Sequence, residues 1–153
     1  MDSVIINGIK YVPEVVAEVE YDFGNGMVPA KRHLNPNGIV GGWVADSASV
    51  EATVIVGKDA QVYGNARVCE KARVCGYAKV YGYAMVYASV WVFGNARVYG
   101  DARVYDNATV YGNAVVTGNA DVYGNAKVYD NGVVGGNTNV CGSEIIIGVH
   151  DGD

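Results

Sequence analysis

The stretch VFGNARVYGDARVYDNATV, residues 92–110, holds three copies of a six-residue unit that decides the fold. Each copy begins with Val, continues with an aromatic residue and two turn-forming residues, and carries Ala four positions after Val. In both directions from this stretch, a Val or Ile recurs at every sixth residue from Val44 to Ile146 without an insertion. The position four residues later is small in most copies; Val54 and Val90 are larger, and Glu144 breaks the pattern near its end.

The six-residue period excludes two simple structures. An α-helix repeats its apolar stripe near every 3.6 residues, and a single long strand alternates every two. The pattern instead predicts a short strand, in which Ala66 and Val68 point inward and Arg67 points outward, followed by a corner. The Tyr-Gly-Asn segment fits that corner because Gly and Asn accept a positive φ at little steric cost. Three corners would close a coil of 18 residues, and about six stacked coils would form a triangular prism roughly 29 Å long.

This repeat resembles the hexapeptide-repeat family, whose fold is the single-stranded left-handed parallel β-helix. The resemblance covers about two-thirds of the chain, and it implies the left hand, since spacing alone gives no handedness. The step from Gly41 to Val44 also resembles the leader of uncharacterised bacterial and prophage members that carry an acyltransferase name. We therefore expect an all-β chain with a β-helix over residues 44–147, a hairpin and capping segment over 1–43, and a polar tail over 148–153.

Residues 1–43 are expected to cover the open end of the prism. Without a cap, the first coil would expose Val44 and Ala48 together with unpaired backbone groups. The Asn7-Gly8 pair between two apolar runs predicts a β-hairpin at the start of this segment. The expected elements are strands over 4–6, 9–12 and 15–21, followed by an irregular leader over 29–42.

Composition favours a single small domain without a nucleic-acid or membrane partner. The 153 residues carry a net charge of −5, but residues 44–146 are close to neutral, with eight Lys or Arg and nine Asp or Glu. This pattern lacks the basic footprint that duplex nucleic acid requires. No apolar run reaches the length of a membrane span, and no secretory signal pattern opens the chain. We therefore expect a cytoplasmic protein.

Stacking every third unit places aromatic residues along all three corners of the prism. Stacked rings at about 4.8 Å spacing would shield the backbone, which explains them without a partner. Amide side chains such as Asn95, Asn113 and Asn131 would likewise bond from coil to coil. Some apolar residues nevertheless face solvent, and exposed patches of this kind mark interaction surfaces. The candidate interaction surface comprises Met85, Trp91, Phe93, Val115, Val133, Tyr87, Tyr105 and Tyr111.

The resemblance implies assembly through these faces, because hexapeptide-repeat proteins commonly form trimers. A homotrimer is therefore expected, with cover by residues 1–43 as the competing account of the apolar side chains. Outward cations could also hold a small anionic ligand, although solvated surface charge is the simpler interpretation. The candidate anion contacts are Arg67, Arg73, Arg97 and Arg103.

Catalytic chemistry has little support in the sequence. Many members of the family are acyltransferases that use coenzyme A and a His base, and its carbonic anhydrase branch needs three His for zinc. This chain has two His, His33 and His150, both outside the regular coils. We carry neither role over, and His33 remains a weak candidate base. The three Cys would lie too far apart for a disulfide, and we expect neither a cofactor nor a metal.

Three hypotheses for function follow. The first is a non-catalytic oligomeric scaffold or binding module, of phage or prophage origin in one version, with the aromatic corners and apolar residues as its surface for a protein partner. The second is an acyltransferase-like enzyme that uses coenzyme A at an intersubunit site. The third binds a nucleotide or another small molecule through Tyr stacking and Arg–phosphate contacts, since each stacked base contributes about 1–3 kcal/mol.

Overall fold

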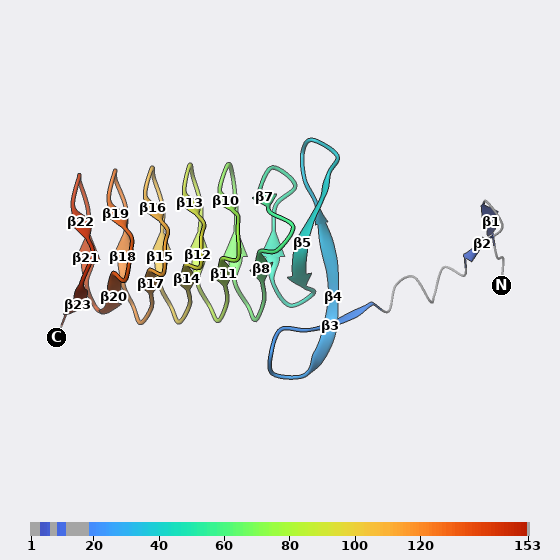
Figure 1. The fold of residues 1–153 in the computed structure, drawn as a ribbon, viewed down its shortest axis with the longest axis horizontal. Helices are drawn as coiled ribbons and strands as arrows, with labels where there is room; N and C mark the ends of the chain where they lie inside the picture. Colours follow the sequence, from blue (N-terminus) through green and yellow to red (C-terminus); the bar gives the residue numbers. More distant parts are fainter. Residues whose placement is uncertain (1–3, 7–8, 12–18, 153) are drawn as a thin grey trace.

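The repeat forms a parallel β-solenoid. The computed structural model describes residues 4–6, 9–11 and 19–152 of the chain. All regular structure in these residues is strand, and about six coils stack along one axis (Figure 1). The described residues contain no helix that is long and apolar enough to cross a membrane. The predicted all-β architecture is therefore confirmed.

Three sheets form the three faces of the solenoid, and each face takes every third strand of the repeat. Face 1 contains β7 (Ile55–Val56), β10 (Arg73–Val74), β13 (Trp91–Val92), β16 (Thr109–Val110), β19 (Lys127–Val128) and β22 (Ile145–Ile146). Face 2 contains β3 (Glu20–Asp22), β4 (Met27–Leu34), β5 (Val40–Ala45), β8 (Gln61–Val62), β11 (Lys79–Val80), β14 (Arg97–Val98), β17 (Val115–Val116), β20 (Val133–Gly136) and β23 (Val149–Gly152). Face 3 contains β6 (Ser49–Val50), β9 (Arg67–Val68), β12 (Met85–Val86), β15 (Arg103–Val104), β18 (Asp121–Val122) and β21 (Asn139–Val140).

Val and Ala fill the inside of the solenoid, as the six-residue pattern predicts. From Val54 to Val128 every inward residue is at most 1 % exposed. The outward strand residues between them are exposed, as Arg73 and Trp91 are, or half-buried, as Lys79 and Met85 are. Backbone N–H groups of one coil donate to carbonyls of the next, for example Arg97 N to Ala114 O at 2.9 Å. Because each coil buries its apolar side chains against its neighbours, the core is one continuous column.

One backbone conformation is used at almost every corner. From Gly64 onward, the residue two positions after the inward Val has a positive φ, and this residue is usually Gly. At Gly94 a Cβ would also lie only 2.9 Å from Gly112 N of the next coil. The expectation that Asn shares the positive φ is wrong, because no Asn among the described residues adopts it. Four corners place a larger residue in this conformation, namely Glu70, Ala88, Asp106 and Asp130.

Replacing Ala88 by Gly should stabilise the solenoid. Ala88 has a φ of 61°, and a residue with a Cβ in this left-handed conformation costs about 1–2 kcal/mol. The greater freedom of Gly in the unfolded chain cancels about 0.5–1 kcal/mol of the gain. We expect the free energy of unfolding to rise by about 0.5–1 kcal/mol in urea denaturation. Ala84→Gly, at an inward position without positive φ, should instead destabilise; an Ala88→Gly variant no more stable than the parent would contradict the assignment of strain.

The segment before the first coil forms an antiparallel sheet. β3 pairs with β4 and β4 with β5, so these strands extend face 2 at one end of the stack (Figure 1). The expectation of an irregular leader over 29–42 was therefore wrong. Pro29 lies at the end of the β3–β4 pairing, opposite Glu20, and its carbonyl accepts from Asp46 N at 2.9 Å. Because Pro29 precedes the residues of β4 that pair with β5, its missing N–H does not interrupt that pairing.

The first hairpin follows the sequence prediction. β1 (Val4–Ile6) and β2 (Ile9–Tyr11) pair antiparallel, with Val4 opposite Tyr11, which confirms the two predicted strands. The Asn7-Gly8 turn and most of the strand expected over 15–21 lie outside the described residues, and β3 begins at Glu20.

Two buried polar side chains close the open edge of face 1. Asn35 Oδ1 accepts from Val56 N at 2.8 Å, and Asn35 Nδ2 donates to Val56 O at 3.1 Å. His33 Nε2 lies 2.7 Å from Val54 O, and it must donate there because a carbonyl oxygen can only accept. β7 is the first strand of face 1, so the Asn35 amide takes the place of a neighbouring strand. These bonds hold the segment before the first coil against face 1, and we call residues 20–45, from β3 to β5, the cap.

The end of the chain adds one more strand to face 2. β23 pairs in parallel with β20, with Val149 beside Val133 and Asp151 beside Gly135. The polar tail expected over 148–153 is therefore a strand from Val149 to Gly152. Asp151 does not continue the outward column of Val133, because the last corner is two residues shorter than the repeat.

Aromatic rings stack along the corners, as predicted. Tyr63, Tyr81 and Tyr99 have ring centroids 4.7 and 4.8 Å apart and nearly parallel planes. Burial, with a smaller contribution from Tyr81, raises the pKa of Tyr63 to about 12. The other columns contain Tyr87, Tyr105 and Tyr123, and Phe93, Tyr111 and Tyr129. The amides of Asn95, Asn113 and Asn131 bond from coil to coil at 3.3 and 3.4 Å.

Candidate functional site

A row of outward side chains along face 2 brings cations, an aromatic ring and an amide together. Arg32 lies opposite Trp43, Trp43 lies beside Gln61, Gln61 beside Lys79, and Lys79 beside Arg97. Neighbouring strands are about 4.8 Å apart, so each side chain is within reach of the next. The row begins in the antiparallel cap and continues into the parallel coils. It therefore depends on β4 and β5 joining face 2.

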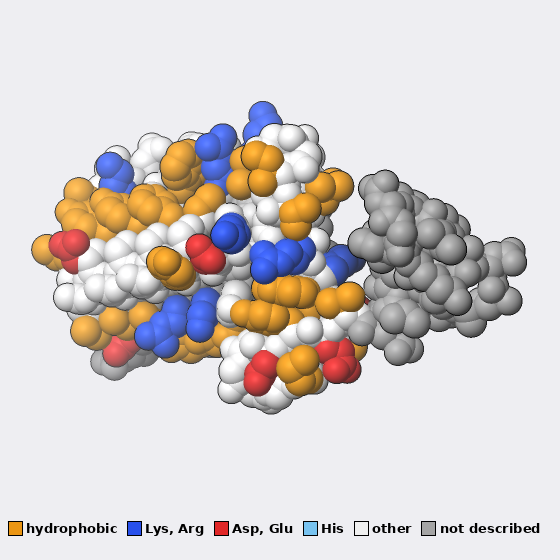
Figure 2. Space-filling view, turned by 45° about the vertical axis from the view of Figure 1, so that its right-hand side comes forward, with side chains coloured by type: hydrophobic (Ala, Val, Ile, Leu, Met, Phe, Trp, Pro, Cys, Tyr) orange, Lys and Arg blue, Asp and Glu red, His pale blue; other side chains and the backbone are white. Residues whose placement is uncertain are grey.

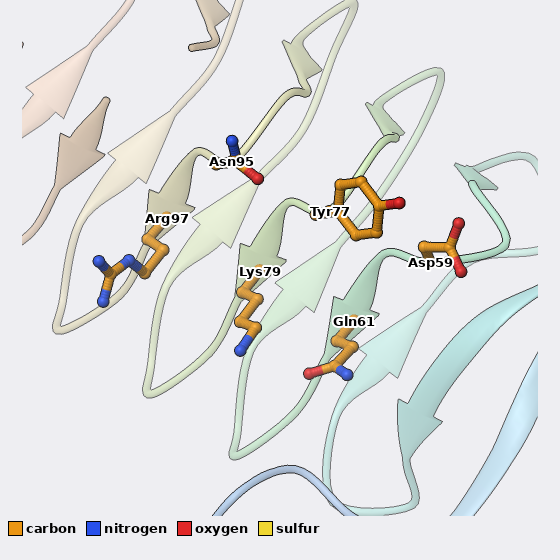
Figure 3. Close-up of a pocket in the computed structure, with 6 residues that line it drawn as sticks. All are labelled: Asp59, Gln61, Tyr77, Lys79, Asn95 and Arg97. Atoms are coloured by element: carbon orange, nitrogen blue, oxygen red, sulfur yellow. The ribbon is translucent and has the colours of Figure 1, made fainter. Parts of the chain in front are cut away.

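A shallow hollow beside this row is the candidate site, and we call it the basic groove. Its volume is about 480 Å³, within the range of small-molecule sites. Two neighbouring columns line it, namely Asp59, Tyr77 and Asn95 at a corner and Gln61, Lys79 and Arg97 on the strands (Figure 3). A second hollow of about 330 Å³ shares Asp59, Gln61 and Tyr77 and reaches the cap at Tyr21, Arg32 and Trp43.

Lys79 and Arg97 are the cations of the basic groove. Adjacent parallel strands hold them in register, and like charges directly opposite on a sheet are destabilising. Neither has an ion pair within the described part of the chain. Arg97 also influences Tyr81, because burial and Tyr99 raise the pKa of Tyr81 while Arg97 opposes the rise. The pair thus presents positive charge that no acidic side chain of the row neutralises.

The other arginines proposed as anion contacts are placed differently. Arg103 forms a bidentate ion pair with Asp121 at 2.7 and 2.8 Å. Arg73 lies over the ring of Trp91, 4.8 Å from its centroid. Arg67 is on face 3, in register with Met85. Of these four arginines, Arg97 is the one that lines the basic groove.

Gln61 has one half of its amide satisfied and the other half unsatisfied. Its Nε2 donates to the Tyr21 hydroxyl at 3.0 Å. Its Oε1 is buried and has no partner among the described residues. A buried acceptor without a partner costs about 1–3 kcal/mol, and such exceptions call for an explanation. Figure 3 shows this oxygen on the side of Lys79.

Tyr77 adds an exposed ring to the wall of the basic groove. It is 65 % exposed and lies outside the corner stacks. Tyr83 is exposed to the same extent, but it follows β11 where Tyr77 precedes it, and it does not line the groove. Tyr77 and Tyr83 are therefore equally exposed, and of the two it is Tyr77 that can contact a ligand of the groove.

The apolar residues predicted as one interaction surface divide among the three faces. Met85 is on face 3, Trp91 on face 1, and Val115 and Val133 are neighbours on face 2. Phe93 meets Trp91 edge-on at 6.1 Å. The corner stacks contain Tyr87, Tyr105 and Tyr111. Met85 therefore lies on another face than Trp91, and both the interaction surface and the homotrimer stay predictions.

The remaining candidates lie away from the basic groove. His33, the weak candidate base, is buried in the cap against Val54, and His150 lies in β23. The three cysteines are free. In residues 4–6, 9–11 and 19–152, no group of three or more His, Cys, Asp and Glu side chains is placed to hold a metal ion.

The residues of the basic groove could be predicted only in part from the sequence. Lys79 and Arg97 stand one coil apart at the outward strand position, and this spacing was the available signal. Tyr77 and Tyr83 occupy the place that Asn has in the repeat unit, which separates them from the stacked tyrosines. The contribution of the cap could not be found in this way, because β4 lies outside the repeat.

Comparison with known proteins supports the fold. A family model described as YdcK Beta solenoid repeat matches residues 60–76 and residues 102–118, both within the parallel coils. No curated protein and no solved structure gives a significant match. The hexapeptide-repeat and acyltransferase resemblance stays a prediction.

Proposed function

We propose that this β-solenoid repeat protein is a non-catalytic binding module that holds a small organic anion in the basic groove. The observation that carries the proposal is the in-register pair of Lys79 and Arg97, which has no acidic partner among the described residues. An anion between them would accept charge-assisted hydrogen bonds from both, and guanidinium geometry matches carboxylate and phosphate. Such an anion would also offset the repulsion between the two cations.

Charge and shape favour a small ligand over a long polyanion. The chain carries a net charge of −5, so its field away from the groove repels an extended anionic polymer. On the side drawn in Figure 2, Lys and Arg side chains occur in small groups among hydrophobic ones. The positive charge of the groove is therefore local, as a small anion requires.

Regular backbone structure fixes the strand positions from which the Lys79 and Arg97 side chains project. Lys79 N donates to Ala96 O at 3.0 Å, and Arg97 N donates to Ala114 O at 2.9 Å. Binding to groups that are already ordered loses less conformational freedom than binding that must order a loop. This rigidity supports a preformed binding surface on face 2.

Exchanging both cations for neutral side chains should remove anion binding. We expect Lys79→Gln combined with Arg97→Gln to weaken binding of sodium pyrophosphate by at least about 100-fold, because two charge-assisted hydrogen bonds are lost and each contributes roughly 1.5–3 kcal/mol. Isothermal titration calorimetry at constant ionic strength measures the effect.

The matched control removes the same charge from other faces. Arg67→Gln combined with Lys127→Gln changes face 3 and face 1 and should leave pyrophosphate affinity within about twofold. Equal weakening in both double variants would show that only net charge matters. That result, or a parent protein that does not bind pyrophosphate, would refute the proposal.

A further inference from the structure

We infer that the ligand of the basic groove is a hydroxylated carboxylate of the uronic acid class. The inference rests on the proposed function, because it names the chemical class of the anion held by Lys79 and Arg97. Three features support it: acceptors in the groove that need a donor from the ligand, an exposed ring, and the spacing between these groups.

Asp59 is the first acceptor that a purely anionic ligand would leave without a partner. Its carboxylate lines the same hollow as Lys79 and Arg97, and it has no ion pair in the described part of the chain. A ligand with negative charge alone would gain no hydrogen bond from this carboxylate. A ligand that offers hydroxyl groups to Asp59 and a carboxylate to the two cations meets both requirements.

Gln61 Oε1 is the second acceptor. Gln61 Nε2 donates to the Tyr21 hydroxyl, and Figure 3 shows Oε1 on the side of Lys79. The Lys79 side chain is long and flexible, so its movement toward a bound carboxylate would open this oxygen to the ligand. A hydroxyl next to that carboxylate would then supply the missing donor.

Tyr77 provides a surface for the apolar side of a sugar. Its ring is 65 % exposed on the groove wall, and an aromatic ring combines a large apolar face with a polar tip. The C–H face of a pyranose can pack on such a ring while its hydroxyls reach Asp59 and Asn95. A carboxylate without a ring, such as acetate, would leave this surface empty.

The close placement of Gln61 and Lys79 favours a compact ligand that carries hydroxyls beside its anionic group. Gln61 is in register with Lys79, so the backbone positions that carry the acceptor and the cation are one strand spacing apart, about 4.8 Å. A carboxylate and a hydroxyl of one sugar ring are separated by a similar distance. A nucleotide also carries ribose hydroxyls near its phosphate, so competition with adenosine monophosphate decides between the two classes.

Displacement calorimetry on the full chain tests this class. Four compounds are titrated in competition with bound pyrophosphate: D-glucuronate, D-glucose, acetate and adenosine monophosphate. We expect D-glucuronate to bind at least about tenfold more tightly than acetate or D-glucose, because it alone combines both sets of contacts. Gln61→Leu should weaken D-glucuronate about five- to tenfold, the effect of one hydrogen bond, and leave acetate unchanged.

The two exposed tyrosines supply a control of matched exposure. Tyr77→Ser should weaken D-glucuronate by about threefold to tenfold, in line with one aromatic contact. Tyr83→Ser, outside the groove, should leave it unchanged. Far-ultraviolet circular dichroism confirms that each variant retains the solenoid. Equal effects of the two substitutions would overturn the inference.

The remaining outcomes separate the inference from the proposed function. If D-glucuronate and acetate bind equally and both depend on Lys79 and Arg97, the sugar class is wrong and the anion site stands. Tighter binding of adenosine monophosphate than of D-glucuronate would assign the groove to a nucleotide and overturn the inference. If pyrophosphate itself does not bind, both proposals fall.

Discussion

Val92→Asp is expected to prevent the solenoid from forming. Val92 is fully buried in the middle of the core column, and an unpaired carboxylate in an apolar interior costs several kcal/mol even after relaxation. Domains of this size have a total stability of about 5–15 kcal/mol. Because every coil stacks on its neighbours, one disrupted coil separates the two halves of the array. Far-ultraviolet circular dichroism and size-exclusion chromatography should show an unfolded or aggregated chain.

Trp91→Asp is the matched control for this prediction. Trp91 precedes Val92 on β13 but points outward and is 46 % exposed. An Asp there remains in water and lies near Arg73, which now stacks on the Trp91 ring. The control should fold like the parent. If Val92→Asp were as well folded as Trp91→Asp, the assignment of inward and outward positions would be wrong.

Asn35→Leu should cause the second large effect, because it removes the side-chain hydrogen bonds that close the open edge of face 1. The Asn35 side chain is 7 % exposed and satisfies both the N–H and the carbonyl of Val56. Leu has a similar volume but leaves both backbone groups buried and unpaired. Each such group costs about 1–3 kcal/mol, so we expect the free energy of unfolding to fall by about 3 kcal/mol in urea denaturation.

Asn37→Ala tests whether the effect belongs to the cap. Asn37 is exposed and its Oδ1 accepts from Ile39 N at 3.0 Å within the same turn. Its loss should cost less than about 1 kcal/mol. An Asn35→Leu variant within about 0.5 kcal/mol of the parent would contradict the account of the cap, because surface substitutions typically stay within that range.

The solenoid could be predicted because its signal is local and unbroken. Every inward position repeats after six residues, so one phase places Val62, Val68 and Val74 on three successive faces. The same arithmetic places Met85 and Trp91 on different faces. They stand six residues apart and therefore lie on neighbouring faces, whereas residues on one face stand 18 apart.

The cap and the groove could not be predicted to the same extent. β4 and β5 pair antiparallel with a shift between Arg32 and Leu34, and no period in the sequence encodes that register. The contacts of Tyr21 and Asn35 with the coils join residues 40 and 21 positions apart. The positive φ of Ala88 could not be predicted either, because stacking of the coils overrides the preference of Ala for negative φ.

Backbone amide shifts in a ¹H–¹⁵N correlation spectrum provide the most direct test of the basic groove. The whole chain would be titrated with sodium pyrophosphate at constant ionic strength. We expect the largest shifts at Lys79, Arg97 and their neighbours Tyr77 and Asn95, and we expect these shifts to disappear in the Lys79→Gln, Arg97→Gln variant. Shifts centred on face 1 or face 3, or no saturable shift at all, would contradict a binding site on face 2.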